Sequence, residues 1–178
     1  MTNEEKRLKL KAAFDVYESF QRDFDYTSRH TKSYASAMWE IIENEKVIYL
    51  DPKGKLITVY IRDRNHFAEV TGLGPSTYDR IKSGADSYVP SLKTFMTLCM
   101  AYQLNMTMVR ELRHTYGYDF NAKDRVHQAY IYLLVNCRGK SLSYCNKVLK
   151  SLGIEGKYYL GDQTIDEQAI EFDVLGEI

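Results

Sequence analysis

The spacing of apolar side chains predicts two helices in the first 45 residues. From Asn3 to about Phe24, apolar positions recur every three or four residues, which is the period of one helix face. Small polar residues at 27–33 interrupt this pattern, and a second apolar stripe runs from Tyr34 to about Glu45. We expect both amphipathic helices to pack against a core.

The next segment, residues 46–62, has a different character. Two runs rich in β-branched and aromatic residues, VIYL and LITVYI, flank DPKG, in which proline and glycine favour a turn. We interpret this segment as a small β-hairpin. The run at 56–61 could instead form a buried helix, because a short apolar run does not distinguish a strand from a helix.

The remaining chain has helical periodicity interrupted by glycine or proline. Helices are expected near 64–70, 75–83, 91–103, 106–116, 124–136 and 141–152. The tail after Gly153 is expected to dock as an extended arm. The predicted fold is mainly α, a helix-turn-helix bundle with N-terminal helices and a hairpin, organised as residues 1–62, a domain at 63–118, a helical hairpin at 119–156 and an acidic tail at 157–178. The hairpin at 119–156 either completes the core or makes a dimer surface.

The stretch Phe67–Gly84 has the features of two short helices that cross steeply. Such a crossing needs a small residue at the close approach and a residue that tolerates positive φ at the corner, and Ala68 and Gly72 supply them. Leu73 would point into the core. Pro75 suits the first turn of the second helix, with Gly74 as its cap.

The second helix of this pair separates into two faces. Tyr78 and Ile81 are three residues apart and would face inward, which leaves a polar outer surface. A recognition helix presents such groups to base edges and phosphates, and Arg80 is the best candidate to read guanine. Asp79 could accept from cytosine, hold Arg80 in place, or only carry surface charge. The outer residues are Ser76, Thr77, Asp79, Arg80 and Lys82.

The following residues complete a longer pattern. Ser83-Gly84 ends the helix, since glycine accepts the left-handed conformation there, and Ser91 is a plausible N-cap for the next helix. Over about residues 64–112, the chain resembles the helix-turn-helix of the phage-repressor-like XRE family. The matching residues are Ala68, Gly72-Leu73, Pro75 to Ile81, Ser83-Gly84 and Pro90 to Thr94.

The resemblance implies sequence-specific binding to double-stranded DNA, usually as a homodimer on an inverted repeat. It also implies that Arg64 and Lys93, each near the start of a helix, touch phosphates. We therefore expect a repressor-like transcriptional regulator that inserts helix 75–83 into the major groove. The expected DNA-binding residues are Arg64, Pro75, Ser76, Thr77, Asp79, Arg80, Lys82 and Lys93.

The net charge of zero conceals an asymmetry along the chain. Residues 158–178 contain six acidic and no basic side chains, so residues 1–157 carry 24 basic against 18 acidic ones. An excess of positive charge favours phosphate contact. The neutral total and Asp79 also favour an alternative, in which the same fold binds a protein partner, as an antirepressor or an antitoxin-like module does.

Other kinds of function find little support. The four histidines and three cysteines form no HExxH or CxxC motif, so we expect no metal, no cofactor and reduced cysteines. Glu111, Asp124 and His127 lie on predicted helices without a nearby nucleophile or glycine-rich loop, so we expect no enzyme. No apolar run is long enough to cross a membrane, and we expect a cytoplasmic protein.

Overall fold

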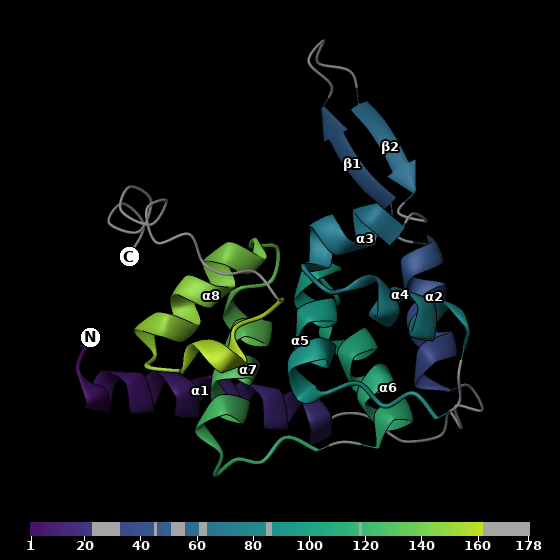
Figure 1. The fold of residues 1–178 in the computed structure, drawn as a ribbon. Coiled ribbons are helices and arrows are strands. Elements are labelled where there is room, and N and C mark those ends of the chain that lie inside the picture. The colour runs from purple at the N-terminus through teal and green to yellow at the C-terminus, as the bar shows by residue number, and fades with distance from the viewer. Residues whose placement is uncertain are drawn as a thin grey trace.

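The protein is mainly helical in a computed structural model, shown as a ribbon in Figure 1. The structure describes residues 1–22, 33–44, 46–50, 56–60, 64–84, 87–117 and 119–161. The N-terminal helices are α1 (Asn3–Arg22) and α2 (Tyr34–Asn44), as the apolar spacing predicts. The predicted extension of these helices to Phe24 and Glu45 lies outside the described residues.

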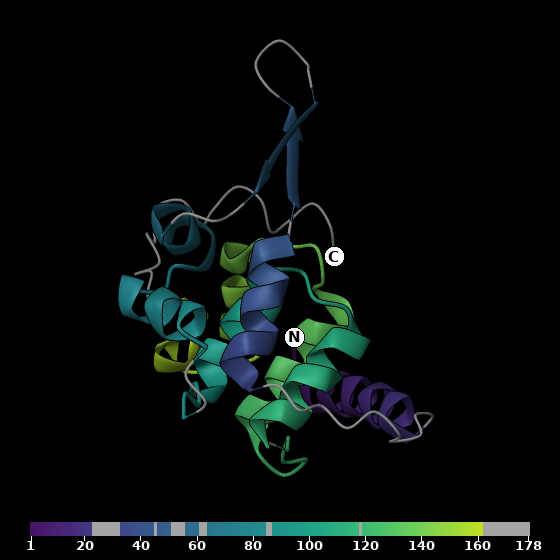
Figure 2. The same cartoon turned by 90° about the vertical axis from the view of Figure 1, so that its right-hand side faces the viewer.

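Two short strands, β1 (Lys46–Leu50) and β2 (Leu56–Tyr60), follow α2. They pair antiparallel, with Lys46 opposite Tyr60 and Leu50 opposite Leu56. Both lie within the interval 46–62, and the DPKG turn and residues 61–63 lie outside the described residues. In the two views of Figures 1 and 2, the strands project from the helical body.

Six helices follow at the positions that the periodicity predicts, and several of them begin or end at the expected capping residues. Ser91 caps its helix by accepting a hydrogen bond from the Thr94 backbone N–H, and Gly84 adopts a φ of 64°. The bounds are α3 (Arg64–Thr71), α4 (Pro75–Lys82), α5 (Leu92–Ala101), α6 (Met106–Tyr116), α7 (Arg125–Asn136) and α8 (Leu142–Ser151), with a short 3₁₀ helix, η1, at Gly156–Tyr158.

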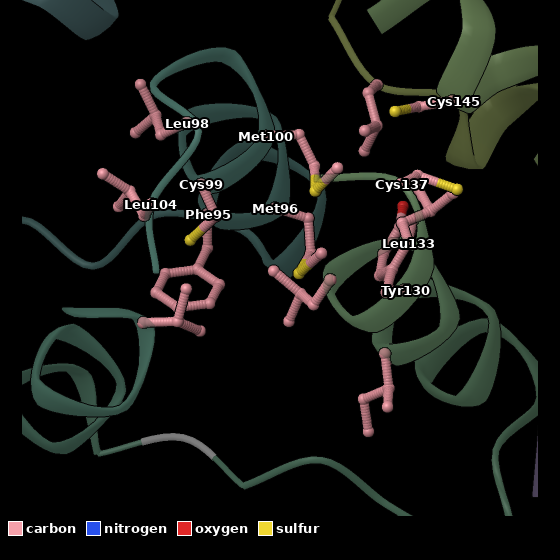
Figure 3. Close-up of a cluster of buried hydrophobic side chains, with 14 of the residues drawn as sticks. Phe95, Met96, Leu98, Cys99, Met100, Leu104, Tyr130, Leu133, Cys137 and Cys145 are labelled. Carbon is pink, nitrogen blue, oxygen red and sulfur yellow. The ribbon is translucent and has the colours of Figure 1, made fainter. Parts of the chain in front are cut away.

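One buried apolar cluster connects the helices. Helix α5 lies at its centre and contacts α3, α7 and α8, while α1 packs along α7. Figure 3 shows Met96 and Met100 of α5 on the side that faces Leu133 of α7. Cys99, Cys137 and Cys145 are buried as free thiols, and burial raises the pKa of Cys137 to about 11.

Helix α2 has a place that the sequence pattern did not reveal. It packs against α4 and against α6 and so supports α4 from the core side. Along the chain, the two strands separate α2 from α3. The Ser33 hydroxyl, at the start of α2, donates to the Gly84 carbonyl at 3.3 Å. The start of α2 is thereby joined to the end of α4.

The start of the tail docks onto the helices, and it includes the 3₁₀ helix η1 where the sequence predicts an extended arm. Asn146 is buried in α8, and its side-chain amide bonds both to the N–H and to the carbonyl of Leu160. The Gly161 N–H donates to the Thr97 hydroxyl of α5 at 3.0 Å, and the Tyr130 hydroxyl donates to the Tyr158 carbonyl. We call residues 156–161 the strap; residues 162–178 lie outside the described part of the chain.

Among the described residues, no helix is both long and apolar enough to span a lipid bilayer. The same part of the chain contains no cluster of His, Cys, Asp and Glu side chains that could hold a metal ion.

Candidate nucleic-acid interface

The turn between α3 and α4, residues 71–73, has the geometry that the sequence predicts. Gly72 has a φ of 63°, and Leu73 is buried. Thr71 adds a feature that the sequence pattern did not suggest, because its fully buried hydroxyl donates to the Phe67 carbonyl and accepts from the Leu73 N–H. These bonds satisfy polar groups that the steep crossing would otherwise leave unpaired in the interior. We call residues 71–73 the corner.

The inner face of α4 is apolar and well packed. Tyr78 and Ile81 are buried, and the Tyr78 ring meets Phe67 of α3 and Trp39 of α2 at centroid distances of 5.4 and 5.6 Å. Both ring pairs are edge-to-face, a favourable arrangement for aromatic side chains. Helix α4 is therefore held between α2 and α3 by its inner face, and its opposite face is largely exposed.

The outer face of α4 carries the polar residues expected there. Pro75, Ser76, Asp79, Arg80 and Lys82 are exposed, and Thr77 is half-buried. The helix begins at Gly74 without a side-chain cap, and the Thr77 N–H bonds to the Gly74 carbonyl at 3.0 Å. This face offers hydroxyl groups near its first turn and two cations toward its end, which are groups that can contact phosphates and base edges.

Asp79 is paired with Arg64, not with Arg80. Both carboxylate oxygens of Asp79 lie 2.6 Å from one guanidinium nitrogen of Arg64, across the α3–α4 pair. The hydrogen bond and the carboxylate charge raise the pKa of Arg64. Of the three roles considered for Asp79, holding Arg80 is not the one observed. The pair offsets the negative charge that Asp79 would otherwise present on this face.

The two cations of α4, Arg80 and Lys82, lie over aromatic rings. The Arg80 guanidinium carbon is 6.0 Å from the centre of the Tyr88 ring. The Lys82 ammonium is 5.8 Å from the rings of both Trp39 and Tyr78. At this range a ring face attracts a cation and limits its freedom. Both side chains are thus partly held by aromatic residues while staying exposed.

Lys93 lies in a different environment from the α4 face. It lines a cleft between the start of α5, the start of α7 and η1, together with Ser91, Asp124, His127 and Lys157. The structure brings Arg64 and Asp79 together across α3 and α4, whereas it groups Lys93 with residues of the C-terminal half.

Sequence reasoning missed three contributors to this surface: Thr71 at the corner, Trp39 beneath Lys82 and Tyr88 beneath Arg80. Tyr88 lies in the loop between α4 and α5, whose residues show no periodic pattern. Trp39 and Lys82 lie on helices that are distant in the chain, so no local pattern marks their contact. Comparisons with protein-family models, with curated proteins and with solved structures find no match to this chain.

Proposed function

We propose that this protein is a sequence-specific, double-stranded-DNA-binding transcriptional regulator of the repressor type, and that α4 enters the major groove. The observation that carries the proposal is the division of α4 into two faces. Tyr78 and Ile81 pack its inner face against the core, while hydroxyl and cationic side chains occupy its exposed outer face. The helix follows directly after the corner that contains Gly72. This is the arrangement that a recognition helix requires.

In this proposal each polar side chain of the surface has a role that its chemistry suits. Ser76, Thr77 and Arg80 contact base edges, and the bidentate guanidinium of Arg80 matches the two acceptors of guanine. Lys82, Arg64 and the exposed ring of Pro75 contact the DNA backbone. The ion pair between Arg64 and Asp79 supports these roles, since it reduces the repulsion between the Asp79 carboxylate and phosphates.

The order of helices supports the resemblance to phage-repressor-like XRE domains. Such a domain needs a helix ahead of the two motif helices, and α2 is suited to that position because it packs against α4 and α6. In this interpretation β1 and β2 are an insertion between the first and second helices of the domain. The family likeness also implies a homodimer that binds two half-sites of an inverted repeat.

A gel-shift experiment with genomic fragments from the organism that encodes the protein tests the proposal. We expect the protein to prefer particular fragments, with affinity that falls steeply between low and physiological salt. Arg80→Ala should reduce the preference for the bound fragment by about 1–3 kcal/mol, since a bidentate base contact is lost. Equal affinity of the unaltered protein for all fragments would refute the proposal.

The matched control for this experiment is Arg7→Ala. Arg7 is an exposed arginine on α1, paired with Glu4, and α1 lies apart from α4 in the views of Figures 1 and 2. The substitution removes the same charge, so we expect fragment preference to be unchanged. A loss equal to that of Arg80→Ala would indicate a general charge effect instead of base reading by α4.

A second candidate function is a protein-interaction module, antirepressor or antitoxin-like. It is favoured by the net charge of zero and by the ion pair that neutralises part of the α4 face. A partner protein would then cover the same outer surface of α4. The absence of any gel shift at low salt, together with a stable complex with a second protein that Arg80→Ala disrupts, would select this candidate.

A further inference from the structure

The loop between α4 and α5 carries an aromatic side chain that connects the core to the α4 face. The Tyr88 ring lies 6.3 Å from the Tyr34 ring of α2, and Tyr34 lies 6.2 Å from Phe95 of α5. Tyr34 and Phe95 are both buried. Three rings therefore run from the core outward, and the last of them is half-buried beneath the Arg80 guanidinium.

The neighbours of Tyr88 in the chain differ in their exposure. Pro90 is buried, whereas Val89 is largely exposed, so the loop turns Tyr88 and Pro90 inward and leaves the apolar Val89 in water.

Tyr88 interacts with two of the three side chains assigned to base contacts. Its ring faces Arg80 at 6.0 Å, and a hydrogen bond with the Thr77 side chain is among the effects that lower the pKa of Tyr88. Burial raises the pKa of Tyr88 despite the opposing effects of the Arg80 charge and of this hydrogen bond. The contact with Arg80 is the one that the ring geometry shows.

We propose that Tyr88 is a positioning residue that sets the base specificity of α4 by fixing the side chain of Arg80 before DNA binds. This inference rests on the proposed DNA-binding function. An exposed arginine loses rotamer freedom when it makes a bidentate contact, and a side chain that is already held loses less. The ring face restrains the guanidinium while leaving its N–H groups available, because a cation–π contact uses the charge and not the donors.

Two substitutions at this position separate the contributions of the ring and the hydroxyl. Tyr88→Phe keeps the ring under Arg80 and removes the hydroxyl group that meets Thr77. Tyr88→Leu keeps apolar bulk next to Tyr34 and removes the ring face. The matched control is Tyr144→Leu in α8. It removes an exposed ring whose centre lies 5.4 Å from the Lys140 ammonium nitrogen.

The first experiment uses the full chain without DNA. Heteronuclear NOE measurements on the Arg80 side-chain Nε–H should show a restrained group in the unaltered protein and in Tyr88→Phe, and a mobile one in Tyr88→Leu. An Arg80 side chain that is equally mobile in all three would overturn the positioning role, whatever the protein binds. Thermal unfolding of each variant shows whether the fold is retained.

The second experiment measures the ratio of affinities for a preferred duplex and for duplexes changed at single base pairs. Tyr88→Leu should reduce discrimination about three- to tenfold at the base pair that depends on Arg80, and should add nothing in an Arg80→Ala background. Tyr144→Leu should leave every ratio unchanged. A uniform loss of affinity for all duplexes would mean that Tyr88 is only structural.

The two experiments separate failure of this inference from failure of the proposed function. If the unaltered protein binds no duplex, the proposed function fails, and the specificity role of Tyr88 fails with it. If the protein discriminates between duplexes while Tyr88→Leu retains the same ratios, only the role of Tyr88 is refuted.

Discussion

Helices α4 and α5 follow one another in the chain and are built in opposite ways. Six successive residues of α5, from Phe95 to Met100, are buried, and the Ser91 side chain caps its first turn. Helix α4 buries only Tyr78 and Ile81, and it starts at Gly74 without a side-chain cap. The comparison suggests that α5 stabilises the fold, while α4 is held in place by its neighbours and presents its polar side chains outward.

The difference between these helices has a consequence for substitutions. A change in α5 acts on the free energy of unfolding, because it alters packing at the centre of the core. A change on the outer face of α4 removes few contacts within the protein and should act on ligand binding instead. The strap joins the two regions, since Gly161 bonds to Thr97 of α5 and lies against the corner that precedes α4.

The largest expected effect on stability comes from the core of α5. Leu98→Ala removes a fully buried side chain and should lower the free energy of unfolding by about 2–5 kcal/mol. Arg80→Ala on α4 should change it by less than about 0.5 kcal/mol. Urea unfolding followed by circular dichroism measures both. Similar losses in the two variants would break the distinction between the helices.

The strap offers the next largest effect. A Cβ atom at Gly161 would lie 2.9 Å from the Thr71 carbonyl oxygen, and Gly161 has a φ of +71°. Gly161→Ala should therefore cost more than the about 1–2 kcal/mol of a left-handed alanine, since backbone must also move. Gly139→Ala is the matched control, because Gly139 has a φ of +82° with no atom within 4 Å of its Cβ. Equal destabilisation of the two variants would show that the close approach to the corner contributes nothing.

A smaller effect is expected at the start of α5. Ser91→Ala removes the hydroxyl that accepts from the Thr94 N–H at 3.1 Å and should reduce stability by about 1 kcal/mol. Ser143→Ala, at an exposed position within α8, serves as the control and should be close to neutral or slightly stabilising. The difference between their urea midpoints is the measurement. No difference would mean that the cap does not stabilise α5.

The smallest expected effect is a gain in stability, from a substitution at the start of α4. Gly74 has a φ of −67°, and no atom lies within 4 Å of a Cβ placed there, so a serine fits without strain. Gly74→Ser should stabilise the protein by a few tenths of a kcal/mol by capping α4. The shift in the thermal midpoint reports it. A lower thermal midpoint would mean that the lack of a side-chain cap at Gly74 does not reduce the stability of the free protein.

The local features of the fold could be predicted from the sequence. Helix bounds follow from glycine, proline and capping residues such as Ser91, and the corner follows from Gly72 because few other residues adopt its φ. The long-range contacts could not be predicted. Arg64 meets Asp79 across 15 positions, and Tyr34 meets Tyr88 across a still longer separation, so neither contact has a local pattern.

The sequence predicted which residues lie on the outer face of α4, but not how the surrounding elements are arranged. The outward residues of α4 follow from helical periodicity, since Tyr78 and Ile81 mark the inner face. The grouping of Lys93 with α7 and η1 depends on how the C-terminal half packs, which no motif encodes. The same packing places α2 against α4, whereas the sequence predicted that α2 packs against a core without indicating which helices it contacts.

The most direct test of base reading by α4 is selection of bound duplexes from a random-sequence pool, carried out with the unaltered protein and with Arg80→Ala. We expect the unaltered protein to enrich an inverted repeat, as a dimer would. The Arg80→Ala variant should lose its preference at one base pair in each half-site. Enrichment of no sequence by the unaltered protein, or of an identical sequence by both proteins, would contradict the assignment of α4 as the reading helix.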